Sequence, residues 1–176
     1  MVMYRRNIVA GSRYFFTVTL LDRASRLLVE RIEELRAAFR LIHTRRPFTI
    51  DAIVVLPDHL HCVWTLPEGD ADYALRWREI KSHFSRRIPA EEQRSPGRIN
   101  KGERGIWQRR YWEHTLRDEE DAERHIDYIH YNPVKHGHVA RVSDWPFSSF
   151  HRFMRHGIYP PYWGGADVSM EGDFGE

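Results

Sequence analysis

The sequence has little cysteine and no long apolar run, and each absence excludes a class of protein. Cys62 is the only cysteine among 176 residues, so neither an internal disulfide nor a cysteine-rich zinc site can form. No run of about 18 apolar residues occurs, which predicts no membrane span. Polar residues between Asn7 and Arg13 interrupt the basic N-terminus, which argues against a secretory signal. We therefore expect a cytoplasmic protein.

The chain also has almost no net charge, but the +2 of the whole sequence hides a basic middle segment. From Arg76 to Arg110 there are eleven Lys/Arg and four Glu, interleaved with aromatic residues. Lys and Arg bind phosphates and aromatic rings stack on bases, so the segment predicts a nucleic-acid-binding surface. A basic face that is merely solvated would have the same composition. The candidate DNA contacts are Arg78, Lys81, Arg86, Arg87, Arg109 and Arg110.

Hydrophobic periodicity predicts an α+β fold. The order is strand, helix, strand, strand, helix, strand, helix, over residues 13–22, 25–46, 48–56, 59–66, 70–88, 106–116 and 117–131. The first six elements form a ferredoxin-like, RRM-like antiparallel sheet with helices on one face. The last helix must then pack against that sheet. We expect one domain over 1–163, including irregular C-terminal pieces, and an acidic, disordered tail over 164–176.

His59 and His61 lie two residues apart in the second strand of a predicted hairpin. Alternate residues of a strand face the same way, so both imidazoles project to one face, about 6 to 7 Å apart along the strand. They could converge on one metal ion, which would need a further ligand. Two ordinary histidines near a strand edge are the alternative.

The last predicted helix offers further candidates. His125, Tyr128 and Asn132 follow one another at spacings of three and four, so they share a stripe beside the buried one. Tyr128 could be a nucleophile, or simply half-buried packing. Pro133 disfavours helical backbone at the preceding residue, so we expect the helix to end at Asn132.

Several segments together resemble the REP-associated tyrosine transposases, a branch of the single-tyrosine HUH (histidine–hydrophobic–histidine) transposases. They are LPDHLHCVWTLP, IKSHFSRRI, IWQRRYWEHTLRDEEDAERHIDYIHYNPVKHG and DWPFSSFHRF. The resemblance runs from near Tyr14 to about Tyr162. The combination of PDHLH with YIHYNPVKHG at this separation is far more specific than either piece alone.

The resemblance implies roles for individual residues. His59 and His61 would hold a divalent cation, Mg²⁺ or Mn²⁺, together with Asn132, which stands where the wider family carries glutamine. Tyr128 would be the single catalytic tyrosine. His114 also fits the pattern without a defined role. The residues leave the proton acceptor of Tyr128 open between His125, one turn away, and a metal-bound water, so His114 and His125 are auxiliary candidates.

The implied activity is that of a metal-dependent endonuclease and strand transferase acting on single-stranded DNA. It would cleave near hairpin-forming repetitive extragenic palindromes through a covalent 5′-phosphotyrosine. The C-terminal segment could occupy the surface that a partner subunit would use, so a monomer is favoured over a homodimer. Alternatives are a binding-only hairpin protein, a domesticated protein that no longer mobilises itself, and a phosphodiesterase whose nucleophile is water.

Overall fold

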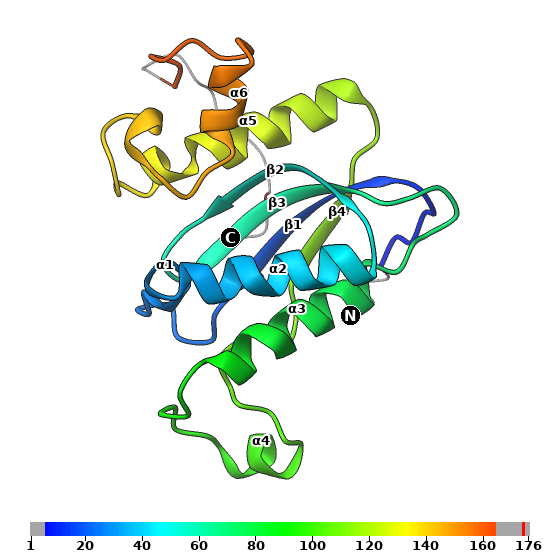
Figure 1. Ribbon diagram of the computed structural model, residues 1–176, viewed down its shortest axis with the longest axis vertical. Helices are drawn as coiled ribbons and strands as arrows, with labels where there is room; N and C mark the ends of the chain where they lie inside the picture. The colour runs from blue at the N-terminus through cyan, green and yellow to red at the C-terminus, as the bar shows by residue number, and fades with distance from the viewer. Residues whose placement is uncertain (1–5, 165–173, 175–176) are drawn as a thin grey trace, which may run out of the picture.

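A computed structural model describes residues 6–164 and residue 174 of the chain. Its centre is a four-stranded antiparallel sheet in the order β2-β3-β1-β4 (Figure 1). The strands are β1 (Arg13–Thr19), β2 (Thr49–Val55), β3 (His59–Thr65) and β4 (Trp112–Thr115). This arrangement confirms the predicted α+β class.

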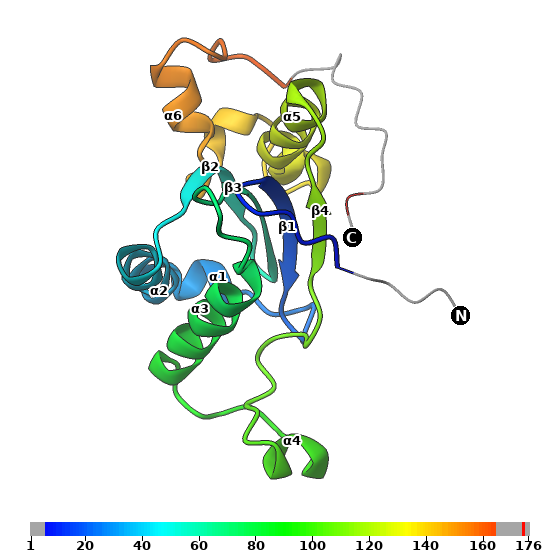
Figure 2. The same cartoon turned by 90° about the vertical axis from the view of Figure 1, so that its right-hand side faces the viewer.

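One face of the sheet is covered by α2 (Ile32–Arg45) and α3 (Tyr73–Arg87), as Figure 2 shows. The core beneath them is rich in aromatic rings. Trp64 of β3 stacks on Trp77 of α3 with ring centroids 4.3 Å apart, and Phe16 packs on both. Large buried rings of this kind supply much of the apolar area that stabilises a small domain.

The opposite face carries α5 (Glu119–Lys135). Phe15 and Val63 point to this side and pack with Ile129 of the helix. Both faces are therefore buried, which explains why the central strands read as nearly continuous apolar runs. Burial on both faces also means that polar side chains pointing towards α5 need a specific reason to be there.

Helix α5 extends beyond its predicted end. Asp118 caps its start by accepting a hydrogen bond from the amide of Asp121 at 2.8 Å, as the acidic first turn predicts. The predicted end at Asn132 is wrong, because the helix passes through Pro133 to Lys135. A proline removes one amide donor, but its preference against a helical preceding residue is overridden here by packing of the helix on the sheet.

Three other predicted elements differ in detail. The helix expected over 25–46 is divided at Arg31 into α1 (Leu27–Glu30) and α2. The strand expected over 106–116 is shortened to β4, with an isolated bridge between Leu20 and Trp107 before it. The stretch over 89–105, between the helix and the strand expected there, contains a short helix, α4 (Pro96–Asn100), which stands out beyond α3.

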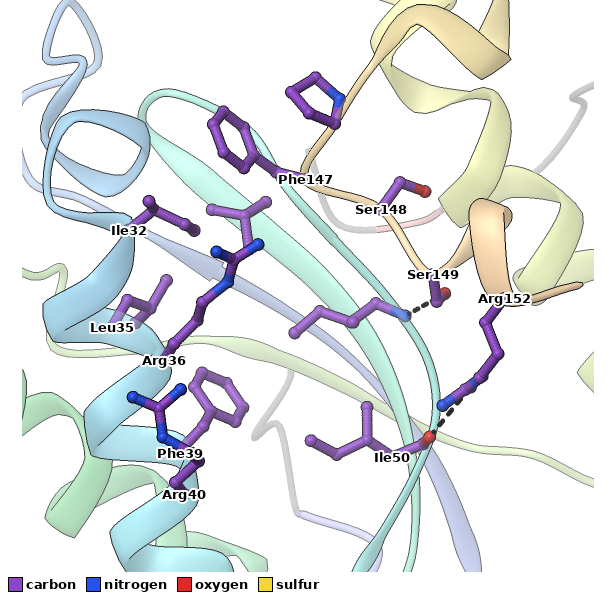
Figure 3. A pocket seen from close by; sticks show the side chains of 13 residues that line it. Ile32, Leu35, Arg36, Phe39, Arg40, Ile50, Phe147, Ser148, Ser149 and Arg152 are labelled. Atoms are coloured by element: carbon purple, nitrogen blue, oxygen red, sulfur yellow. Dashed lines mark hydrogen bonds between the residues drawn. The ribbon is translucent and has the colours of Figure 1, made fainter. Parts of the chain in front are cut away.

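The C-terminal segment covers the edge strand β2. The amide of Val55 donates to the carbonyl of Phe147 at 2.9 Å, and the amide of Ser149 donates to Ile53 at 2.8 Å. This segment contains a short 3₁₀ turn (Val142–Asp144) and α6 (Phe150–Arg155). A cavity of about 360 Å³ remains between it and α2 (Figure 3). Covering an edge strand in this way prevents another chain from pairing with it.

Among the helices of residues 6–164, none combines the length and the apolar character that a membrane crossing requires.

Candidate metal and tyrosine site

The two histidines of β3 lie together on the face of the sheet that α5 covers. Their ring centroids are 4.9 Å apart, and both side chains are almost fully buried, at 2% exposure for His59 and 0% for His61. Leu60 and Cys62 point into the opposite core. The predicted alternation along β3 is therefore confirmed.

The Nδ1 atom of each imidazole is hydrogen-bonded to a side-chain oxygen atom. Asp58 Oδ1 lies 2.8 Å from His59 Nδ1, and Thr17 Oγ1 lies 2.8 Å from His61 Nδ1. The Thr17 hydroxyl donates its proton to the carbonyl of Phe174, so it accepts from His61. Each Nδ1 then carries the proton, and Nε2 is the atom that each ring offers to an ion.

Asp58 is well suited to holding its histidine. Burial alone would raise the pKa of this carboxyl group, but hydrogen bonds and charge interactions with His59 and Arg23 lower it to about 2. Arg23 Nε donates to Asp58 Oδ2 at 2.6 Å. The carboxylate is therefore ionised near neutral pH and accepts a hydrogen bond from the protonated Nδ1 of His59.

Tyr128 reaches the histidines from α5. Its ring centroid lies 5.3 Å from that of His61, and the side chain is 1% exposed. The Nζ atom of Lys135 donates to the Tyr128 hydroxyl at 3.1 Å and lies 4.8 Å from its ring centroid. A phenol, an ammonium group and two imidazoles from one chain thus meet in one place.

Along α5, Asn132 lies between the two residues that contact the histidine pair, Tyr128 and His136. Tyr128 contacts His61, and His136, two turns further along α5, lies 5.2 Å from His59 between ring centroids. Asn132 is midway on the same helical face and is fully buried. A donor set of two imidazole Nε2 atoms and a carboxamide fits a divalent cation with open coordination positions.

Phe174 closes this site from the C-terminal end of the chain. Its ring stacks on that of Tyr128 with centroids 3.7 Å apart and planes inclined by 10°, and it also contacts His125. Of the predicted disordered tail over 164–176, residues 165–173 and 175–176 lie outside the described residues. Phe174 itself is 6% exposed and occupies space beside the tyrosine.

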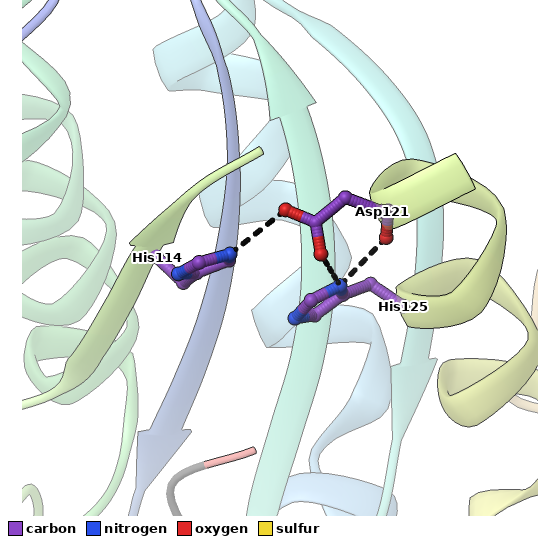
Figure 4. A group of neighbouring side chains, drawn as sticks. All are labelled: His114, Asp121 and His125. Carbon is purple, nitrogen blue, oxygen red and sulfur yellow. Dashed lines mark hydrogen bonds and ion pairs between the residues drawn. The ribbon is translucent and has the colours of Figure 1, made fainter. Parts of the chain in front are cut away.

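The two auxiliary histidines belong to a separate cluster at the start of α5. His114 Nε2 lies 3.0 Å from Asp121 Oδ2, and His125 Nδ1 lies 2.7 Å from the Asp121 carbonyl oxygen (Figure 4). The guanidinium groups of Arg117 and Arg124 also donate to the Asp121 carboxylate, as does the backbone amide of Arg117. Burial opposes ionisation, but these hydrogen bonds hold the pKa of Asp121 below its usual range.

This cluster has ligand types that a metal could use, since its side-chain donor atoms all lie within 4.8 Å of one another. A cation there would have to displace the guanidinium groups of Arg117 and Arg124 from Asp121. The arrangement better suits a clamp that ties β4 to the helix carrying Tyr128. Burial lowers the pKa of His125, which makes it a weaker proton acceptor than a free imidazole.

Four of the six predicted DNA contacts line two adjoining hollows of about 530 and 720 Å³ beside α3. Arg78, Lys81 and Arg109 line the smaller hollow with Arg6, and Lys81, Arg86 and Arg109 line the larger one. Arg87 and Arg110 are exposed nearby in sequence but do not line either hollow. The basic segment therefore forms a surface with two concave regions.

Gln108, which lines the larger hollow, is hydrogen-bonded to the strand next to the one that carries the histidine pair. The amide of Gln108 donates to the carbonyl of Thr19 at 3.0 Å, and Thr19 pairs with His59 on its other side. By contrast, Trp77 and Trp107 are buried in the core at 1% and 8% exposure, so they do not present faces for stacking on bases.

Residues 9–132 match the family described as transposase IS200-like, and the chain belongs to that family. Its curated relatives include a REP-associated tyrosine transposase of Escherichia coli, 49% identical over 92% of this chain and 90% of the relative. A Haemophilus influenzae protein provisionally given the same name is 48% identical over 97% of this chain and 98% of the relative.

A solved structure described as a REP-associated tyrosine transposase bound to a REP hairpin is similar throughout. It is 47% identical, with a TM-score of 0.82, and the match covers 96% of this chain and 94% of that one. The resemblance to REP-associated tyrosine transposases and the α+β fold predicted from hydrophobic periodicity are thereby confirmed.

Sequence reasoning missed four residues of the site. Asp58 and Thr17 hold the histidines, but only the β1–β3 register places Thr17 opposite His61. Lys135 is seven residues from Tyr128, a spacing of two helical turns that was hidden by the expected end at Asn132. Phe174 carries no local signal, because its contact with Thr17 joins residues that are 157 positions apart in the sequence.

Proposed function

We propose that this chain is a metal-dependent endonuclease and strand transferase for single-stranded DNA, acting beside hairpin-forming palindromic repeats. The observation that supports this most directly is the meeting of Tyr128 with His59 and His61 within one chain. A binding module would have no use for a phenol, an ammonium group and two oriented imidazoles in one buried place. The hairpin-bound relative supports the class of substrate.

In the proposed reaction, the Tyr128 oxygen attacks the phosphorus of a phosphodiester. A bond forms between that oxygen and the 5′-phosphate, the bond to the 3′-oxygen breaks, and the released strand ends in a 3′-hydroxyl after taking up a proton. Attack by a 3′-hydroxyl on the phosphotyrosine reverses the step, so rejoining needs no ATP. The phenol proton must leave during attack, because a phenol with a pKa of about 10 is a weak nucleophile.

His59, His61 and Asn132 would hold a divalent cation, Mg²⁺ or Mn²⁺, that polarises the scissile phosphate when bound. Imidazole ligands favour Mn²⁺ over Mg²⁺, which prefers oxygen. Lys135 places a positive charge at the Tyr128 oxygen, where it favours the phenolate and then the charge of the phosphotyrosine. Asp58 and Thr17 keep the imidazoles in the orientation that presents Nε2.

The basic hollows beside α3 would hold the hairpin. Arg78, Lys81, Arg86 and Arg109 would contact its phosphates, and the exposed Arg87 and Arg110 would extend the same surface. Because Tyr128 and both histidines come from one chain, the proposed site needs no partner subunit, which supports the expectation of a monomer.

The decisive experiment incubates the full chain with a hairpin carrying a single-stranded flank and Mn²⁺, followed by denaturing gel electrophoresis. The wild-type protein should form a covalent adduct. The Tyr128→Phe variant should bind the hairpin equally well and form no adduct, and the His59→Ala variant should lose the adduct too.

A phosphodiesterase whose nucleophile is water would still cut the DNA in the Tyr128→Phe variant. A binding-only protein would show neither cutting nor adduct in the wild type. Either result would replace the proposed function.

A further inference from the structure

The end of helix α5 places a third imidazole beside the histidine pair. His136 is the residue that caps the C-terminus of α5, and its ring centroid lies 5.2 Å from that of His59, at an interplanar angle of 74°. The His59–His61 centroid distance is 4.9 Å, so His136 approaches His59 almost as closely as His61 does. Neither the sequence motifs nor the comparisons assign it a role.

The backbone explains how His136 comes to this position. It lies four residues after Asn132, so both side chains project from the same side of the helix. Its own backbone is still nearly helical, with φ −85° and ψ 3°, because the helix continues past Pro133. Gly137 then turns the chain away with φ 70°, a left-handed conformation that glycine adopts without strain.

The neighbouring histidine differs in its surroundings. His138 stacks on Trp145 with ring centroids 5.2 Å apart, and its ring is 6.1 Å from that of His136. His136 is exposed at the end of α5, whereas His59 and His61 are buried. An exposed imidazole next to the buried pair lies where a cation held by that pair could be reached.

We propose that His136 is a further ligand for the cation held by His59 and His61, giving a site of three imidazoles and the Asn132 carboxamide. This inference rests on the metal site of the proposed function. It predicts a stronger preference for Mn²⁺ over Mg²⁺ than two imidazoles would give, because each added nitrogen ligand favours the softer transition-metal ion. A histidine that merely stabilised the helix C-terminus would not alter ion preference.

The test measures Mn²⁺ binding to the full chain without DNA, by electron paramagnetic resonance of the free ion, with Mg²⁺ as competitor. The His136→Ala variant should bind Mn²⁺ at least about tenfold more weakly. It should also discriminate less between Mn²⁺ and Mg²⁺. The His156→Ala variant, which alters an exposed histidine after α6, should match the wild type. Thermal melts of the metal-free proteins should show that all variants fold.

The His59→Ala variant separates this inference from the proposed function. If it abolishes Mn²⁺ binding while His136→Ala leaves affinity and ion preference unchanged, His136 is not a ligand and the inference is wrong. If His59→Ala itself leaves Mn²⁺ binding unchanged, the metal site of the proposed function is wrong, and the role of His136 is overturned with it.

Discussion

The ammonium group of Lys135 and the hydroxyl group of Tyr128 are 3.1 Å apart, although seven residues separate them on α5. This contact exists because the helix runs through Pro133 and completes two turns beyond the tyrosine. Lys135 is exposed whereas Tyr128 is buried, so a side chain at the surface contacts the hydroxyl group of a tyrosine in the interior of the site.

Replacing Lys135 should slow adduct formation while leaving hairpin binding intact. The Lys135→Met variant keeps much of the side-chain length but loses the charge beside the Tyr128 oxygen, and we expect a rate about 100-fold lower, as for other groups that stabilise developing negative charge. Lys135→Arg should recover part of that rate. The measurement is the single-turnover rate of adduct formation at saturating DNA.

Lys101 provides the matched control for this experiment. It is an exposed lysine at the end of α4, away from Tyr128, and Lys101→Met should react at the wild-type rate once DNA is saturating. Equal rates for Lys135→Met and the wild type would show that the ammonium group takes no part in the reaction.

The sequence predicted the sheet, its major helices and the histidine pair because these depend on local periodicity. Alternation along residues 59–65 determined which side chains face α5, and the structure agrees. The resemblance added Tyr128 to the pair. These features need only short-range spacing or a recognisable motif.

The missed features depend on contacts between distant segments. A rule about the residue before proline predicted the wrong end for α5, because packing on the sheet outweighs a local preference. Thr17 and Phe174 join the site across 157 residues of sequence. No local pattern could place His136 beside His59, since that contact needs both the true end of the helix and its position over β3.

Removing the ring that covers Tyr128 should make the tyrosine more reactive. The ring centroids of Phe174 and Tyr128 are 3.7 Å apart. Stacked pairs contribute about 0.5–1.5 kcal/mol, so removing the Phe174 ring should make the Tyr128 hydroxyl roughly two- to tenfold more accessible to DNA. The Phe174→Ala variant should therefore form adduct several-fold faster in single-turnover assays. Tyr162→Ala alters an aromatic residue that is 83% exposed, and should leave the rate unchanged. If the Phe174→Ala variant formed adduct more slowly, the ring would support the reaction of Tyr128 and would not hinder it.

Breaking the clamp at the start of α5 should destabilise the whole domain. Asp121 has a side chain 1% exposed and receives hydrogen bonds from His114, Arg117 and Arg124. The Asp121→Asn variant leaves these donors poorly matched, and we expect a loss of about 3 kcal/mol in urea unfolding. Asp144→Asn breaks an exposed pair with Arg141 and should change stability by less than about 1 kcal/mol. Equal stabilities of the two variants would contradict the clamp.

Hairpin binding should weaken as the pH rises from 7 to 9, because of Lys81. Burial, with a contribution from the charge of Arg6, lowers the pKa of Lys81 to about 8. A phosphate beside Lys81 favours the charged form, so binding takes up a proton once the free side chain is neutral, and affinity falls above pH 8. One pKa unit corresponds to about a tenfold change, which sets the expected size of the decline.

The same lowered pKa has a consequence for stability. The unfolded chain holds the Lys81 proton up to its ordinary pKa of 10.5, whereas the folded chain releases it near 8. The unfavourable contribution of the buried charge is therefore complete below pH 8 and disappears as the pH rises to about 10.5. A variant that removes the charge but keeps the apolar stem, Lys81→Met, should fold without loss of stability at pH 7.

Fluorescence anisotropy of a labelled hairpin, at constant ionic strength and without divalent cations, measures this decline. Lys81→Met should bind more weakly than the wild type at pH 7 and show a flat profile up to pH 9. Arg86→Met should also bind more weakly, but it should keep the wild-type slope because an arginine does not titrate in this range. If Lys81→Met retained the full decline, the proton would belong to another group, and Lys81 would not face the phosphates of the hairpin.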